Sequence, residues 1–236
     1  MATRLYDVVV DSADPARLGR FWSALLEREI TGESADEVDV ALSPGTELVF
    51  VPVPDPKTVK NRVHLDLAST SADHQAALVA RARDLGARPV DIGQGAMPWV
   101  VLADPEGNEF CVLEPRDEYL DVGPVAAVVI DALDPRAQAA FWSHATGLPV
   151  VREHAECASL RQESAFWLEF VRVTGAKAVK NRVHLDVVPP ADGDLLIEVA
   201  RLESQGAVRA DVGQSAVSWV VLADPEGNEF CVLTPR

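Results

Sequence analysis

The chain has 236 residues, of which 48% are hydrophobic and 25% charged, a composition typical of a folded globular protein. Its 37 acidic and 21 basic residues give a net charge of -16, which would repel nucleic-acid phosphates and anionic lipid surfaces. No apolar run approaches the roughly 20 residues that cross a bilayer, and the beginning MATRLYDVVVD lacks the apolar core of a signal peptide. We therefore expect a cytoplasmic protein with neither nucleic acid nor membrane as a partner.

The chain consists of two similar halves, which we call repeats. The first begins with an apolar strand pattern that is followed by a helix. Asp14 suits the N-cap and Pro15 the first helical position. The helix then shows one apolar face, with Leu18, Phe21, Trp22, Leu25 and Leu26 at helical spacing. The same signal recurs at Asp134 and Pro135, where Gly147 is expected to end the helix. Strand-rich stretches follow, at residues 38–42 and 47–53 in the first repeat and 158–162 and 166–173 in the second.

The order of elements then starts again within each repeat. Residues 62–67 alternate as a strand does, residues 73–85 form an amphipathic pattern ended by Gly86, and a DPEGN turn joins strands at 99–103 and 109–113. In the second repeat Gly206 is the matching helix stop. Each repeat therefore predicts βαβββ twice, which gives an α+β fold of four modules.

Long identical segments establish the repeat itself. The block WVVLADPEGNEFCVL begins at Trp99 and again at Trp219, and VKNRVHLD begins at Val59 and again at Val179. An ungapped register of this length requires that both copies fold alike. We expect one domain at residues 1–116, a linker at 117–123 and a second domain at 124–236.

This organisation resembles the vicinal oxygen chelate superfamily, which includes glyoxalases, bleomycin-resistance proteins and extradiol dioxygenases. The matching motifs are the DxxxxxxFW helix signal at Asp14 and Asp134, the HLD strand at His64 and His184, and the DPEGNEF turn at Asp104 and Asp224. The resemblance implies that paired βαβββ modules curve their sheets into two cups, as in a glyoxalase-like two-domain protein.

The resemblance also implies where a divalent metal would be held. The family's ligand positions fall on Asp7, Glu47, His64 and Cys111 in the first repeat, and on Ala127, Trp167, His184 and Cys231 in the second. A cysteine stands in both repeats where metal-dependent relatives carry a glutamate. No cofactor is therefore favoured, although Asp7, Glu47 and His64 leave a divalent metal possible in the first domain.

Each HLD strand places a histidine and an aspartate on one face. His64 with Asp66, and with Glu109 as an alternative partner, would suit general acid-base catalysis, but such a pair is also a common structural feature. The buried-thiol interpretation is favoured for Cys111 and Cys231 over a role as ligand or nucleophile.

Two duplicated features allow a ligand-binding and a structural interpretation. The basic segments Lys60–Arg62 and Lys180–Arg182 would hold a ligand's anionic group or neutralise acidic side chains such as Asp104 and Glu106. Trp99 and Trp219 would form flat pocket walls, whereas Trp22 and Trp142 would pack helix against sheet. The two repeats differ most before residue 60, so we expect two unlike pockets, the more aromatic one containing Phe166, Trp167 and Phe170.

Three functions are compatible with these residues. The favoured one is a module that binds a small organic molecule in a sheet-lined cup without a conventional metal centre, with His64, Trp99, Cys111, Trp167, His184, Trp219 and Cys231 as pocket residues. The alternatives are a metal-dependent lyase, isomerase or dioxygenase acting on vicinal oxygens through the first domain, and metal-free acid-base catalysis by His64 with Asp66 or Glu109. The partner would be a small-molecule ligand, and the chain a pseudo-symmetric monomer or a homodimer.

Overall fold

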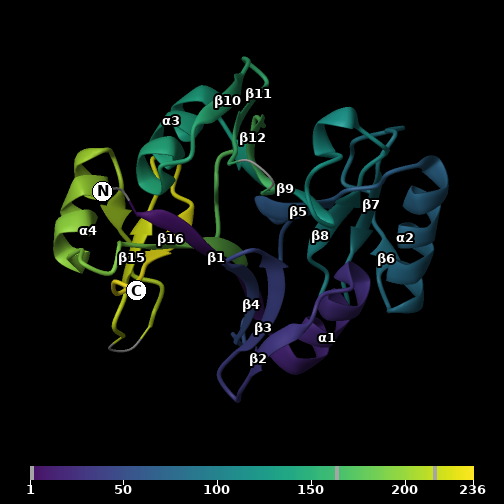
Figure 1. Ribbon diagram of the computed structural model, residues 1–236, viewed down its shortest axis with the longest axis horizontal. Helices are drawn as coiled ribbons and strands as arrows, with labels where there is room; N and C mark the ends of the chain where they lie inside the picture. The colour runs from purple at the N-terminus through teal and green to yellow at the C-terminus, as the bar shows by residue number, and fades with distance from the viewer. Residues whose placement is uncertain (1–2, 163–164, 215–216) are drawn as a thin grey trace.

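The computed structural model describes residues 3–162, 165–214 and 217–236, and its elements form four βαβββ modules along the chain (Figure 1). The first module contains β1 (Arg4–Ser12), α1 (Pro15–Leu26), β2 (Ile30–Glu33), β3 (Val38–Ser43) and β4 (Thr46–Pro52). The second contains β5 (Val63–Leu67), α2 (Ala72–Asp84), β6 (Arg88–Pro89), β7 (Val100–Ala103) and β8 (Glu109–Val112), and a short 3-10 helix, η1 (Asp117–Tyr119), follows it.

The second repeat follows the same order. Its third module contains β9 (Val125–Ala132), α3 (Pro135–Thr146), β10 (Val150–Glu153), β11 (Cys157–Leu160) and β12 (Trp167–Arg172). The fourth contains β13 (Val183–Val188), α4 (Leu195–Ser204), β14 (Val208–Arg209), β15 (Val220–Ala223) and β16 (Glu229–Val232). The α+β class with four modules is thus confirmed. The sequence analysis missed β2, β6, β10 and β14, because strands of two to four residues are too short to show an alternating pattern.

The helix ends follow the expected capping chemistry. The Asp14 side chain accepts a hydrogen bond from the Arg17 backbone N–H, and Asp134 accepts one from Ala137 N–H. Gly147 ends α3 with φ = 74°, a left-handed conformation that glycine adopts without strain. The helix boundaries predicted from these residues are therefore confirmed.

The two sheets do not correspond to the two repeats. Sheet A has the strand order β14-β15-β16-β13-β1-β4-β3-β2, and sheet B has the order β10-β11-β12-β9-β5-β8-β7-β6. Sheet A thus joins the first module to the fourth, through antiparallel pairing of β1 with β13, and sheet B joins the second to the third, through β5 and β9. Half of each repeat contributes to each sheet, so neither sheet belongs to one repeat alone.

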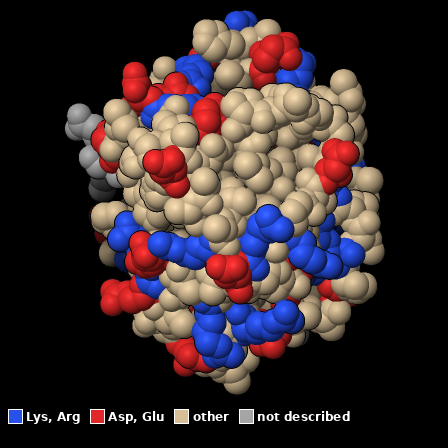
Figure 2. All heavy atoms as spheres, turned by 90° about the vertical axis from the view of Figure 1, so that its right-hand side faces the viewer, with Lys and Arg blue, Asp and Glu red and all other residues tan. Residues whose placement is uncertain are grey.

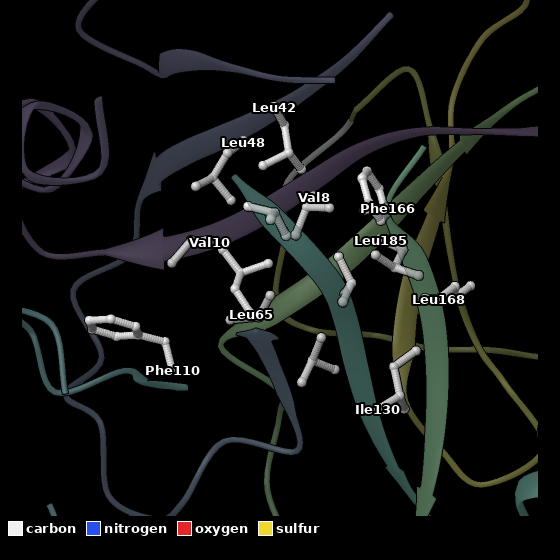
Figure 3. Close-up of a cluster of buried hydrophobic side chains, with 14 of the residues drawn as sticks. Val8, Val10, Leu42, Leu48, Leu65, Phe110, Ile130, Phe166, Leu168 and Leu185 are labelled. Carbon is white, nitrogen blue, oxygen red and sulfur yellow. The ribbon is translucent and has the colours of Figure 1, made fainter. Parts of the chain in front are cut away.

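One face of each sheet packs into a shared core with the helices. On β1, Val8 and Val10 enter this core, as do Leu65 of β5 and Ile130 of β9 (Figure 3). The intervening residues point to the opposite face, because side chains alternate along a strand. We call these opposite faces cup A, on sheet A, and cup B, on sheet B.

Two tryptophans pack helices against the sheets, as expected. The Trp22 ring lies 5.1 Å from Phe110 edge-on, and its indole N–H donates to Asp104 Oδ2. Trp142 makes the equivalent contacts with Phe230 and Asp224. The duplicated DPEGNEF turn therefore holds the helix of the preceding module.

One face of the molecule mixes charges of both signs, although the whole chain has a net charge of -16. On the face shown in Figure 2, basic and acidic side chains are interspersed among uncharged ones, so this face presents no field of one sign. Within the described residues, every helix is too short or too polar to span a bilayer.

Candidate functional site

A row of four side chains crosses cup A from strand to strand. Cys231 on β16 pairs in register with Asp186 on β13, Asp186 pairs with Asp7 on β1, and Asp7 pairs with Glu47 on β4. Residues in register on neighbouring strands project to the same face. His184, two residues before Asp186, lies on this face too, with its Nε2 atom 3.6 Å from Asp186 Oδ1. This row and His184 therefore bring three carboxylates, an imidazole and a thiol to one face of sheet A, where Asp39 of β3 adds a fourth carboxylate.

The carboxylates of this row crowd one another in a partly dry environment. Burial and then the charge of Asp7 raise the pKa of Asp186 to about 7. Burial also raises the pKa of Asp7 to about 6, although the Glu47 backbone N–H donates to Asp7 Oδ1 at 3.0 Å. Arg236 is the basic residue that opposes both shifts. Cup A is thus rich in negative charge with little positive charge to balance it.

The other two polar groups of cup A are neutral. Burial, helped by the charge of Lys180, lowers the pKa of His184 to about 3, so its imidazole is uncharged. Burial and the neighbouring Asp186 raise the pKa of the Cys231 thiol, which keeps its proton and donates it in a hydrogen bond to Asp186. A protonated thiol is a poor nucleophile and a poor metal ligand.

A cationic and aromatic group stands beside this row. The Tyr6 ring carries the guanidinium of Arg4 at 4.9 Å and that of Arg236 at 5.1 Å, and Arg236 Nη1 donates to the Tyr6 hydroxyl. Tyr6 packs on the small apolar cluster of cup A that includes Cys231. An anionic group on a ligand in cup A would find its counter-charge here.

Cup B contains a histidine, an aspartate and a cysteine equivalent to His184, Asp186 and Cys231 of cup A, and we call each set of three a triad. The rest of its row differs. His64 Nε2 lies 3.4 Å from Asp66 Oδ1, and Asp66 pairs in register with Cys111 on β8. Along the row, however, Asp66 is followed by Ala127 on β9 and Trp167 on β12. Cup B therefore lacks the two carboxylates that Asp7 and Glu47 supply in cup A.

The segment expected to be the linker packs a tyrosine into cup B. Tyr119 of η1 is 4% exposed, and its ring lies 5.9 Å edge-on from that of Trp167. The Tyr119 hydroxyl donates to Glu169, which also accepts a hydrogen bond from Ser159. The apolar cluster around Tyr119 and Trp167 includes Cys111. The His64 and Asp66 side chains remain 14% and 13% exposed, as do those of His184 and Asp186 in cup A.

Two arginines also pack on the Trp167 ring, and we call Tyr119 with its partners in cup B the plug. Arg152 pairs with Glu118 at 2.6 Å and with Glu169 at 3.5 Å, and its guanidinium lies 4.9 Å from the Trp167 ring. Arg161 lies 5.0 Å from the same ring. Part of cup B is thus occupied by packed aromatic and charged side chains of the protein itself.

The structure separates residues that the sequence analysis grouped as one metal set. Asp7 and Glu47 lie on sheet A, whereas His64 and Cys111 lie on sheet B. The grouping of Asp7 and Glu47 with His64 is therefore corrected, and the histidine beside them is His184. The error arose because each sheet draws on both repeats.

Several other expected site residues have structural contacts. Glu109 accepts from Lys57 Nζ at 2.8 Å and from the Asn61 backbone N–H, so it is engaged away from His64. Of the aromatic residues expected to make a pocket, Trp167 lies in cup B, but Phe166 and Phe170 belong to the shared core on the other face. The aromatic character expected of that pocket is therefore held by Trp167 together with Tyr119.

The two pocket-wall tryptophans have different surroundings. Trp99 donates from Nε1 to Gln94, and the Arg116 guanidinium lies 5.7 Å from its ring centroid. It lines a cavity of about 320 Å³ together with residues 90–92 and 94–97. Trp219 is 38% exposed. Both tryptophans remain candidates for ligand contact, with Trp99 already engaged by its neighbours.

The basic segments bridge the two repeats. Lys60 pairs with Asp131 at 2.8 Å, and Arg62 lies 3.7 Å from Glu226. In the other direction, Arg182 lies 3.4 Å from Glu106, one of the two acidic residues expected as partners. The other, Asp104, instead accepts from Trp22.

Three residues that build the plug had no signal in the sequence analysis. They are Tyr119, Arg152 and Glu169. An aromatic residue in a polar linker was the one available hint for Tyr119, and nothing in the pattern links it to Trp167 across sheet B.

The donor set of cup A fits a divalent cation better than that of cup B. The ligand atoms of His184, Asp186 and Cys231 lie within 4.8 Å of one another, as do those of the equivalent triad in cup B. Asp7 and Glu47 lie along the same row in cup A alone, outside this group of three, and bring two further carboxylates to that face. Carboxylates with a neutral imidazole suit divalent ions such as Mn²⁺, Fe²⁺ or Zn²⁺, which would also relieve the repulsion between the carboxylates.

Comparisons with known proteins agree with this architecture. A family model described as "Glyoxalase-like domain" matches residues 7–113 and 127–233. Glyoxalase I from Zea mays is similar in structure, with a TM-score of 0.68 at 14% identity over 99% of this chain and 92% of that one. A putative dioxygenase from Bacillus subtilis has a TM-score of 0.65 at 14% identity, covering 99% of this chain and 86% of that one. No sequence among curated proteins matches the chain.

These matches define first the class and then the family. The fold is that of the vicinal oxygen chelate superfamily, to which glyoxalases and dioxygenases belong. Since two family-model matches cover most of its length, the chain belongs to the glyoxalase-like domain family.

Proposed function

We propose that cup A is the working site, and that it binds a small oxygen-bearing organic molecule at a divalent cation held by Asp7, Glu47 and His184. The observation that carries this proposal is the register of β13, β1 and β4, which brings an imidazole from one repeat beside two carboxylates from the other. Cup B has the equivalent histidine but no carboxylates at these two positions, and Tyr119 packs against Trp167 there.

The remaining residues of cup A would orient the bound molecule. A cation in this position would supply Lewis-acid polarisation of the ligand's oxygens. Asp186 Oδ1 lies 3.6 Å from His184 Nε2 and would orient the ring through a closer contact once the cation is bound. Arg236 beside Tyr6 offers a guanidinium to an anionic group of the ligand. The apolar residues Val221 and Leu233 would pack on its carbon atoms.

Metal analysis of matched variants tests the proposal. The full chain, purified without chelators, is expected to contain one Mn²⁺, Fe²⁺, Ni²⁺ or Zn²⁺ per molecule by elemental analysis. His184→Ala and Asp7→Ala are expected to lose it, because each removes a ligand. His64→Ala, the matched variant in cup B, is expected to keep it. Metal that is lost in His64→Ala and kept in His184→Ala would overturn the assignment of cup A.

A second function is favoured by the cysteine of the row. Cys231 stands in the position where metal-dependent relatives of the superfamily carry a glutamate, and its thiol is protonated. A metal-free module that binds a small organic molecule in cup A would need no ligand there. Two results together would favour this function. Calorimetric titration would show no uptake of a divalent ion, and binding of a small molecule would still change the fluorescence of Trp219.

A further inference from the structure

A second row of side chains crosses cup A, two residues along the strands from the row that contains Asp7. His184 on β13 pairs in register with Val9 on β1, and Val9 pairs with Val49 on β4. Val49 in turn pairs with Asp39 on β3. Since residues in register project to the same face of a sheet, an imidazole and a carboxyl group stand at the two ends of an apolar floor.

The carboxyl group of Asp39 has no counter-charge among the described residues. It forms no ion pair there, and its Oδ1 atom is buried without a hydrogen-bond donor. Burial, and then the charges of Glu37 and Glu47, raise the pKa of Asp39 to about 6. The charge of Asp39 also raises the pKa of Asp7, so the two carboxyl groups face the same cup. Asp39 is thus left for a partner from outside the chain.

Gly32 provides the space that the Asp39 carboxyl group occupies. The two residues pair in register on β2 and β3, and a Cβ atom at Gly32 would overlap Asp39 Oδ2. The equivalent pair in the second repeat is Arg152 and Ser159, and there the arginine forms part of the plug. A carboxyl group beside a position without a side chain is therefore a feature of cup A and not of cup B.

The charge balance at this end of cup A favours a cation on the ligand. Within the described part of the chain, no basic side chain opposes the charges of Glu37 and Glu47 at Asp39. A divalent cation held by Asp7 and Glu47 would neutralise those two groups and leave Asp39 unpaired. An ammonium group donates up to three hydrogen bonds to carboxylates, whereas an anion would be repelled. The net charge of -16 also attracts cationic ligands.

The strand spacing limits the length of such a ligand. Strand β1 is the middle one of the three that would hold the cation, and β3 lies two strands away from it, at roughly 10 Å. A metal–oxygen bond of about 2 Å and a charge-assisted hydrogen bond of about 2.8 Å take up the ends of this span. The remaining distance of about 5 Å fits an oxygen and a nitrogen separated by roughly three carbon atoms.

We propose that cup A takes a small aliphatic amine that carries a metal-binding oxygen group about three carbon atoms from its ammonium group. The oxygen group binds the cation, the carbon chain packs on Val9 and Val49, and the ammonium group donates to Asp39. This inference rests on the function proposed above for cup A, and it assigns to Asp39 the selection of the ligand.

Calorimetric titration of the metal-loaded full chain at pH 7.5 tests the assignment. The probes are 3-aminopropanohydroxamate, 3-hydroxypropanohydroxamate and propanohydroxamate, which bind divalent ions through the same two oxygens and differ only in their terminal group. We expect the amine to bind about tenfold or more tightly than propanohydroxamate, because it adds a charge-assisted hydrogen bond. The hydroxyl compound is expected to lie between them, since its hydrogen bond has a neutral donor.

Variants of the β2–β3 hairpin locate the selectivity. Asp39→Asn is expected to keep the metal, because Asp39 is not one of its ligands, and to reduce the preference for the amine to about twofold or less. Gly32→Ala displaces the carboxyl group and is expected to reduce the preference as well. It serves if the Asp39→Asn protein folds poorly. Asp36→Asn removes an exposed charge between the same strands and is expected to keep the full preference.

The possible outcomes separate this inference from the function on which it rests. Protein that holds no metal and binds none of the hydroxamates would overturn both. Protein that holds a metal and binds the hydroxamates, but does not bind the amine most tightly, would overturn only the assignment of Asp39. A preference for the amine that persists in folded Asp39→Asn and Gly32→Ala proteins would do the same, because another group would then select it.

Discussion

Cup A and cup B use the same triad in different surroundings. Each has histidine, aspartate and cysteine from the VHLD and EFCV strands, which are identical in the two repeats. They differ along the adjoining strands, where the positions of Asp7 and Glu47 in cup A correspond to those of Ala127 and Trp167 in cup B. The half of each repeat that is nearly identical thus supplies the same three groups twice. The half that differs places carboxylates beside them in cup A and an apolar cluster beside them in cup B.

Removing the plug is expected to have the largest effect on this comparison. Tyr119→Ala should lower the free energy of unfolding by about 4 kcal/mol, because it empties a buried ring-sized space beside Trp167 and leaves Glu169 without its phenol donor. Urea denaturation followed by circular dichroism measures the loss. Added p-cresol should restore part of it by occupying the space, as apolar molecules occupy cavities made by truncation.

The control for this variant is Tyr6→Ala in cup A. Tyr6 is half-buried under two arginines, so its loss should cost about 1 kcal/mol. Equal costs for the two tyrosines, with no effect of p-cresol, would show that the linker does not hold cup B together.

The acidic row should make the stability of metal-free protein depend on pH through cup A. The folded-state pKa of Asp186 is about 7 and its ordinary value is 3.8, so between these values the folded state binds more protons than the unfolded state. Stability should then fall as pH rises from about 4 to 7, with the penalty absent below this window and complete above it. Asp7, with a pKa of about 6, contributes in the same direction.

Asp186→Asn is therefore expected to stabilise chelator-treated protein by about 2 kcal/mol at pH 8 and to flatten its stability between pH 4 and 7. Thermal melts across this range provide the measurement. The matched variant Asp66→Asn in cup B is expected to stabilise less, since Ala127 replaces the facing carboxylate. If both variants flatten the profile alike, the crowding of Asp7 and Asp186 is not the cause.

Contacts that are the same in both repeats should give the smallest losses in the free energy of unfolding, and the losses should be equal in the two repeats. Trp22→Phe and Trp142→Phe each remove an indole N–H from a buried aspartate, at about 1 kcal/mol. We expect the two losses, measured by denaturant titration, to agree within about 0.5 kcal/mol. A larger gap would mean that the two halves are not equivalent even where their sequences are.

The candidate site was only partly predictable from the sequence. Asp7, Glu47 and His184 were each identified as positions of interest, and the protonated cysteines fit their expected burial. The set was assembled incorrectly, with His64 in place of His184, and the plug of Tyr119, Arg152 and Glu169 was missed. Local patterns report which face of a strand a residue occupies, but they do not report which strand lies beside it.

The sequence by itself determined the four modules, their helix caps and the duplicated triad, because these depend on residues close together in the chain. Only the tertiary structure decided which modules share a sheet. Strand β1 had a nearly identical partner available in each repeat, VHLDL at β5 and VHLDV at β13, so local pairing favours neither. The choice of β13 depends on how both sheets bury their apolar faces in one core, and that choice placed His184, rather than His64, beside Asp7.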